Sequence, residues 1–218
     1  MRTGLYSNRI LKIIEEFPVG ELFTNEKIVE LLKKEFDLPT SNAELITNNK
    51  LKRLYDDGRI ERIKKGVYYV PKQTVFGKVK PDYNKYAVDL LTKNKDEIIG
   101  YESGASFLNR IGLSTLIPRE IEVVSNNYRK KLPEACHIIA KKPPAPVTRE
   151  NFRYLQVLDV ISGMNTFHID AENPIKILNS VIYRNGLEHI KLAGYARKYY
   201  PQRVLPNVID IVMGDDLP

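Results

Sequence analysis

Amide and cationic side chains between residues 41 and 71 could recognise nucleic acid. In the segment SNAELITNNKLKRLYDDGRIERIKKGVYYVP, three of them share one face of an expected helix, and three more lie in an expected hairpin. Asn pairs well with adenine and Arg or Lys with guanine in the major groove, whereas cations at a hairpin tip neutralise phosphates. The candidate DNA-binding residues are Asn49, Lys52, Arg53, Arg62, Lys64 and Lys65.

A helix and a tight hairpin would position these side chains. Ser41 and Glu44 have the S-x-x-E spacing of a capping box, which predicts a helix start at this point. Gly58 then supplies the left-handed residue that ends a helix. The β-favouring runs 59–63 and 67–71 are separated by a short turn, in which Gly66 can take the positive φ that such a turn needs.

The start of this helix remains open from the sequence. A helical wheel predicts one buried face, made of Thr47, Leu51, Leu54 and Tyr55. Leu45 and Ile46 fall off that face if the helix begins at Asn42, so a later start near Thr47 is an alternative. Because of this ambiguity, the outward Asn42 is left out of the candidate set. An ordinary solvated helix face remains the alternative reading of the other polar residues.

Two further helices are expected before this segment. The first covers residues 7–17 with Ser7 as its N-cap, and the second is capped by Thr24 or Asn25 and reaches Phe36. Helix, helix, helix and hairpin over residues 7–71 is the order of a winged helix-turn-helix. We therefore predict this domain over residues 1–72 and a linker over residues 73–83, where Gly77 and Pro81 interrupt any helical periodicity.

Residues 84–218 are predicted to form a small α+β domain that ends in a helical cluster. After a helix over residues 84–93, residues 98–125 read as strand, helix and strand, followed by a basic turn at 126–131 and a partner strand at 135–141. We expect this turn to be a solvated hairpin tip; a second phosphate contact and a toxin-opposing surface are the alternatives. Helices are then expected at 151–161, 174–183, 187–200 and 202–213, with Asn173 as a cap and Pro174 in the first turn. The predicted fold class is α+β.

Charge is concentrated in the first third of the chain. The formal net charge is +7, and residues 1–80 hold 16 Lys and Arg against 11 Asp and Glu, which accounts for +5 of it. A basic domain joined to a nearly neutral one is the pattern expected of a nucleic-acid footprint at one end. Solvated surface charge would give the same composition, so charge alone does not decide the function.

Targeting signals and disulfides are not expected. No apolar run approaches the roughly 20 residues of a membrane span, and the start MRTGLYSNRILKIIEEF is too charged for a secretory signal. The single Cys136 excludes an intrachain disulfide and is compatible with a reducing compartment. These features predict a soluble, cytoplasmic protein.

Catalytic residue patterns are weak. Cys136 and His137 are adjacent in an expected strand, where their side chains point to opposite faces and cannot act together as nucleophile and base. The three histidines lack metal-ligand spacing, and no phosphate-binding glycine loop exists, so we expect no cofactor and no metal. A metal-dependent nuclease is the lesser alternative, since such sites combine carboxylates with lysine; it would use Glu102, Glu120, Glu122, Lys141 and Lys142.

Several segments, taken in order, resemble a known family. The hairpin RIERIKKGVYYVPK is followed by FGKVKPDY, IIGYESGASFLNRIGLSTLIPREIEVVSNN, LQVLDVI and YARKYYP. Their order and spacing resemble those of AbiEi-type antitoxins of bacterial type IV toxin–antitoxin, or abortive infection, systems, over nearly the whole chain. The resemblance implies an N-terminal winged helix-turn-helix that represses its own operon and a C-terminal domain that opposes a nucleotidyltransferase-like toxin, without requiring a stable direct complex.

Together these observations predict a non-enzymatic, DNA-binding transcriptional regulator that acts as an antitoxin. Its partners would be double-stranded DNA, namely the operator of its own operon, and functionally the toxin; more than one copy could occupy the operator. By position, the resemblance assigns DNA contact to the same six residues of the third helix and hairpin. The alternative from another class is a protein-interaction module whose winged helix does not bind DNA.

Overall fold

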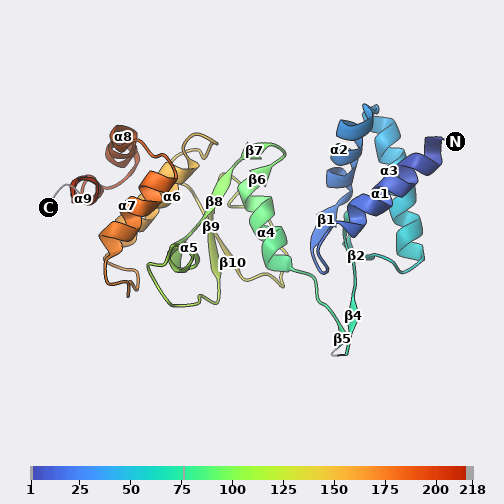
Figure 1. Cartoon of the computed structure of the whole chain (residues 1–218), viewed down its shortest axis with the longest axis horizontal. Helices are drawn as coiled ribbons and strands as arrows, with labels where there is room; N and C mark the ends of the chain where they lie inside the picture. The colour runs from blue at the N-terminus through green and yellow to red at the C-terminus, as the bar shows by residue number, and fades with distance from the viewer. Residues whose placement is uncertain (1, 76, 215–218) are drawn as a thin grey trace. The chain divides into compact units, whose positions relative to one another are not determined.

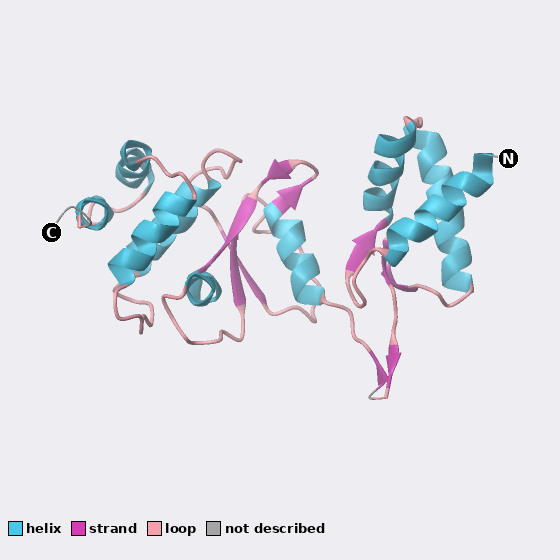
Figure 2. Cartoon of the chain, in the orientation of Figure 1, coloured by secondary structure: helices cyan, strands magenta, loops and turns pink. Residues whose placement is uncertain are grey.

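The computed structural model describes residues 2–75 and 77–214 (Figure 1). The chain divides into two compact units, Met1–Tyr86 and Ala87–Pro218. Each unit combines helices with small sheets (Figure 2), so the fold is α+β as predicted. Within the described ranges, no helix combines the length and the apolar character needed to span a bilayer.

The first unit is a winged helix-turn-helix. Its elements are α1 (Arg2–Glu15), β1 (Leu22–Thr24), α2 (Asn25–Phe36), α3 (Thr40–Asp56), β2 (Glu61–Lys64) and β3 (Val67–Tyr69). The strands form an antiparallel sheet in the order β1-β3-β2. Strand β1 was not predicted, since three residues are too few for an alternating pattern. The expected helix–helix–helix–hairpin order is confirmed, with β1 inserted between the first two helices.

A compact apolar core holds the three helices and the sheet together. Ile10 of α1, Ile28 of α2 and Leu51 of α3 are fully buried, and Phe23 of β1 is 1% exposed. The predicted cap of α2 is confirmed at Thr24, whose hydroxyl accepts a hydrogen bond from the backbone N–H of Lys27 at 3.1 Å. This side chain satisfies one of the N–H groups left unpaired at a helix start.

Two predicted helix starts are wrong. Helix α1 already begins at Arg2, so Ser7 lies inside it rather than capping it. Helix α3 begins at Thr40 after the N-cap Pro39, with no side-chain capping bond, so neither a Ser41 capping box nor a start near Thr47 is observed. Pro39 has a φ of −56°, the ring-restricted value, and its carbonyl accepts the first helical bond from Ala43 at 3.0 Å. Backbone geometry rather than a side chain sets this start.

The segment after the hairpin contains a second, shorter one. Strands β4 (Gln73–Thr74) and β5 (Gly77–Lys78) pair antiparallel within the range predicted as a linker. Helix α4 (Tyr83–Thr92) follows, close to its expected range. Because Tyr86 and Ala87 are neighbours in α4, the division between the two units falls inside this helix.

The second unit is built on a three-stranded sheet in the order β10-β9-β8. A small hairpin of β6 (Lys93–Asn94) and β7 (Glu97–Ile98) precedes it, and α5 (Gly104–Ile111) connects β8 (Gly100–Ser103) to β9 (Ile121–Ser125). Strand β10 (Ile138–Lys141) runs parallel to β9. The expectation of a hairpin tip at residues 126–131 is therefore wrong, because parallel neighbours require a crossover connection.

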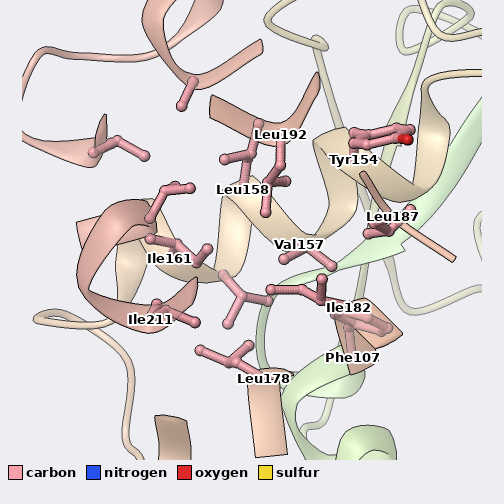
Figure 3. Close-up of a cluster of buried hydrophobic side chains, with 14 of the residues drawn as sticks. Phe107, Tyr154, Val157, Leu158, Ile161, Leu178, Ile182, Leu187, Leu192 and Ile211 are labelled. Carbon is pink, nitrogen blue, oxygen red and sulfur yellow. The ribbon is translucent and has the colours of Figure 1, made fainter. Parts of the chain in front are cut away.

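Four helices complete the second unit: α6 (Phe152–Gly163), α7 (Pro174–Arg184), α8 (His189–Tyr199) and α9 (Val204–Met213). Figure 3 shows their side chains meeting those of α5 in one core, with Phe107 beside Ile182. The predicted cap of α7 is confirmed, since Asn173 accepts from the backbone N–H of Lys176 at 3.1 Å and Pro174 follows it. The expected helical cluster is thus present.

Candidate nucleic-acid interface

Helix α3 presents three of the candidate residues to solvent. Asn49, Lys52 and Arg53 are all exposed, because Leu51 and Leu54 take the buried positions between and beside them. The helical period forces this separation, since residues three and four apart share a face. The predicted outward face of α3 is therefore present, and it carries one amide and two cations.

The hairpin presents the other three candidate residues to solvent. Arg62 and Lys64 are exposed on β2, and Lys65 is exposed in the turn to β3. The guanidinium carbon of Arg62 lies 5.1 Å from the ring centroid of Tyr55, a residue in the last turn of α3. Tyr55 was predicted to be buried but is 42% exposed. Its ring instead joins Arg62 of the hairpin to the helix through a cation–π contact.

Asn25, the first residue of α2, ties the hairpin turn to α3. Its backbone N–H donates to the carbonyl of Gly66 at 3.0 Å, and its Nδ2 donates to Oδ1 of Asn48 at 3.3 Å. Gly66 has a φ of +78°, and a Cβ built there would lie 2.9 Å from Oδ1 of Asn25. Only glycine fits this close approach without strain. The turn that carries Lys65 is therefore held at a defined place beside α3.

The five cations of the set are electrostatically available. Across residues 2–75 and 77–214, none of them forms an ion pair, whereas Arg9 and Arg59 of the same unit do. The ammonium of Lys64 lies 5.9 Å from the ring centroid of Tyr86, a contact that leaves its charge unneutralised. Unpaired surface cations are what phosphate neutralisation requires.

The one carboxylate of β2 is engaged within the protein. Glu61 pairs with Lys78 at 2.5 Å and accepts a hydrogen bond from the hydroxyl of Tyr69. The hydrogen bond from Lys78, followed by that from Tyr69, lowers the pKa of Glu61. Burial, together with the neighbouring Glu61, raises the pKa of Tyr69 to about 12. The negative charge on β2 is thus compensated by Lys78, which reduces its repulsion of a phosphate backbone.

Sequence reasoning missed Leu45 as a surface residue of α3. Its side chain is 62% exposed, and it precedes Asn49 by four residues and Lys52 by seven, so the three share a face. An exposed aliphatic side chain can contact the C5-methyl group of thymine in the major groove. The spacing of Leu45, Asn49 and Lys52 could have indicated a shared exposed face. It does so only for a helix that includes Leu45, and the sequence left the helix start undecided.

The residues considered for nuclease chemistry do not form a metal site. Glu102 pairs with Arg110 at 2.7 Å, Glu122 pairs with Lys141, and Glu120 lies exposed before β9. In the described part of the chain, no group of three or more His, Cys, Asp or Glu side chains could hold a metal ion.

Cys136 and His137 lie in the loop before β10. The expectation that they belong to a strand is therefore wrong.

Comparison with known proteins identifies a family. A family model described as a family of unknown function (DUF6088) matches residues 9–146. The match covers more than half of the chain; it includes the second half of α1 and the whole of the candidate interface, and it ends between β10 and α6. No curated protein matches the chain.

Proposed function

Given that the chain belongs to the DUF6088 family of unknown function, we propose that it is a DNA-binding transcriptional regulator. The observation that carries this proposal is the set of five exposed cations on α3 and the β2–β3 hairpin, none of which forms an ion pair with a residue that the structure describes. Asn25 and Tyr55 hold α3 and the hairpin together. The cations of both elements can therefore act on one ligand.

In the proposed complex, α3 enters the major groove and the hairpin contacts the flanking backbone. Asn49, Lys52 and Arg53 face base edges, with Leu45 beside them for a thymine methyl. Arg62, Lys64 and Lys65 neutralise phosphates, which fixes the position of the helix without reading sequence. In this proposal, α3 provides sequence specificity, and the hairpin adds affinity for DNA of any sequence.

The biological role that we propose is that of an antitoxin. It rests on the resemblance to AbiEi-type antitoxins, in which a winged helix-turn-helix represses its own operon while the C-terminal part opposes a nucleotidyltransferase-like toxin. A direct complex with the toxin is not required by this role. Expression of the chain together with a neighbouring toxin gene should restore growth that the toxin alone arrests, and unchanged arrest would reject the antitoxin role.

A binding assay tests the DNA-binding proposal. The full chain should bind a labelled duplex from upstream of its own gene more tightly than a duplex of the same composition in scrambled order. Substituting Asn49, Lys52 and Arg53 together by alanine should remove that preference. The matched control is Arg59→Ala, because Arg59 is an exposed cation already paired with Glu15 at 3.3 Å. Equal binding of both duplexes by the unsubstituted chain would reject sequence-specific regulation.

Exposed apolar side chains favour a second candidate, a protein-interaction module. Leu45 and Tyr55 of α3 and Ile63 of β2 are 62%, 42% and 37% exposed. Aromatic and aliphatic side chains of this kind can anchor a protein partner. The same assay separates the two candidates, since a protein-docking surface would show no DNA affinity of its own.

A further inference from the structure

A cavity of about 600 Å³ lies in the second unit. Its walls come from the end of α4, the β6–β7 hairpin, β8, and helices α5, α6 and α7. This volume is within the range of sites that hold small molecules. Neither the proposed DNA binding nor the proposed regulation uses it.

Positive charge dominates the lining. Lys93, Arg110, Arg153 and Arg184 line the cavity, against a single carboxylate, that of Glu102. Arg110 pairs with Glu102 at 2.7 Å, and Lys93 pairs with Asp89 at 3.0 Å. Arg153 and Arg184 have no ion-pair partner among the residues that the structure describes. Two exposed arginines from different helices, α6 and α7, therefore offer their charge to a ligand.

The walls between these cations are aromatic and aliphatic. Phe107 and Phe152 line the cavity, together with Val88, Ile98 and Val181. The guanidinium carbons of Arg110 and Arg153 each lie 5.3 Å from the ring centroid of Phe107 and Phe152, respectively. Guanidinium groups supported by aromatic rings present flat surfaces on which a planar apolar group can stack.

Three neutral polar side chains of the lining each donate one hydrogen bond within the protein. Gln156 donates to the carbonyl of Glu102 at 2.7 Å, and Asn185 donates to that of Val181 at 2.7 Å. Thr92 donates to the carbonyl of Val88 at 2.8 Å. These bonds fix the orientation of the three side chains, and the two arginines without ion-pair partners supply the charge that attracts a ligand.

We propose that this cavity binds a nucleoside phosphate. Arg153 and Arg184 receive the phosphates, because the guanidinium fork matches phosphate oxygens in geometry and charge. The base packs between the guanidinium group of Arg110, which lies over Phe107, and the aliphatic wall. Because the charge of the two arginines drives binding, affinity follows the number of phosphates.

Isothermal titration calorimetry of the full chain with ATP, GTP, adenosine and inorganic triphosphate tests this site. ATP and GTP should both bind, adenosine should not bind, and triphosphate should bind more weakly than ATP. The Arg153→Ala/Arg184→Ala variant should bind ATP at least about tenfold more weakly, the loss expected for two charge-assisted contacts.

Three controls assign the binding to this cavity. Arg197→Ala removes an exposed charge from α8, outside the lining, and should leave ATP affinity unchanged. Lys64→Ala/Lys65→Ala should also leave it unchanged, which separates this site from the hairpin. Circular dichroism should show that all variants remain folded.

Three results would overturn the proposal. The first is that ATP does not bind, and the second is that triphosphate binds as tightly as ATP. The third is that the cavity variant and the Arg197 control bind ATP equally well. Success or failure of the DNA-binding assay does not affect any of them.

Discussion

Leu45 and Asn49 owe their exposure to buried residues two positions before them in α3. Ala43 and Thr47 are fully buried on the opposite side of α3, so the positions two residues away face solvent. The buried residues on one side of α3 thus determine which side chains face solvent. In the sequence, Leu45 lies off the predicted buried face, whereas an apolar residue of a helix is usually expected to be buried.

Leu45→Ala should weaken discrimination for thymine at one position of the binding site. The expected loss is about 1 kcal/mol, the lower end of the range for a mismatched base, because only a methyl contact is removed. Replacing that thymine with deoxyuridine, which lacks the methyl group, should weaken the unsubstituted chain but not the variant. Leu31→Ala on α2 is the control, since Leu31 is also exposed. Equal sensitivity of the Leu45 variant and the unsubstituted chain to deoxyuridine would reject the contact.

Asp159 of α6 should give the stability of the second unit a distinctive pH dependence. Its carboxylate accepts hydrogen bonds from the hydroxyls of Tyr200 at 2.7 Å, Tyr101 at 3.0 Å and Ser103 at 3.2 Å. Burial nevertheless raises its pKa above the ordinary value of 3.8. The charged form therefore costs stability near neutral pH; this cost should shrink as the pH falls through the raised pKa and be gone below the ordinary pKa of 3.8.

Asp159→Asn removes this titration. Urea unfolding at a series of pH values should show a smaller gain in stability on acidification than in the unsubstituted chain. The control is Asp210→Asn, an exposed carboxylate of α9. Identical pH profiles for the unsubstituted chain and the Asp159 variant would contradict the assignment.

At the scale of elements, the hairpin turn depends on Gly66. Gly66→Ala should lower the free energy of unfolding by more than the roughly 1–2 kcal/mol that a left-handed alanine costs. The excess arises because the added Cβ would meet Oδ1 of Asn25 at 2.9 Å. Gly58→Ala is the matched control, since Gly58 has a similar φ of +70° but no neighbour within 4 Å of a Cβ. Urea denaturation measures both, and equal losses would show that the Asn25 side chain moves away from the added Cβ without cost.

Local signals predicted most elements but not how they combine. The turn at Gly66, the cap at Thr24 and the Asn173–Pro174 helix start were predicted, because each depends on a few adjacent residues. The parallel pairing of β10 with β9 was not, since strand direction is decided by distant contacts.

Contacts between separate elements could not be predicted for the candidate site either. The six residues could be named from the sequence, whereas the links from Asn25 to Gly66 and from Arg62 to Tyr55 join separate elements and required the structure.

At the scale of the whole molecule, the two units have separate cores. The core of the first unit includes Leu51, and that of the second includes Leu158; both side chains are fully buried. Leu158→Ala should lower the stability of the second unit by about 2–5 kcal/mol, through lost burial and a cavity. DNA affinity should not change at a temperature where the variant is still folded. Leu51→Ala should reduce both stability and DNA affinity, and a loss of DNA affinity in the Leu158 variant would show that the units are coupled.

The salt dependence of DNA binding tests the central proposal most directly. Each phosphate contact contributes about 0.9 to the slope of log K against log salt concentration. Lys64→Ala/Lys65→Ala should therefore reduce the steepness by up to about 2 and weaken binding to all sequences alike. Lys191→Ala/Lys198→Ala, which removes two exposed lysines from α8, should leave the slope unchanged. An unchanged slope in the hairpin variant would contradict the proposed role of the hairpin on DNA.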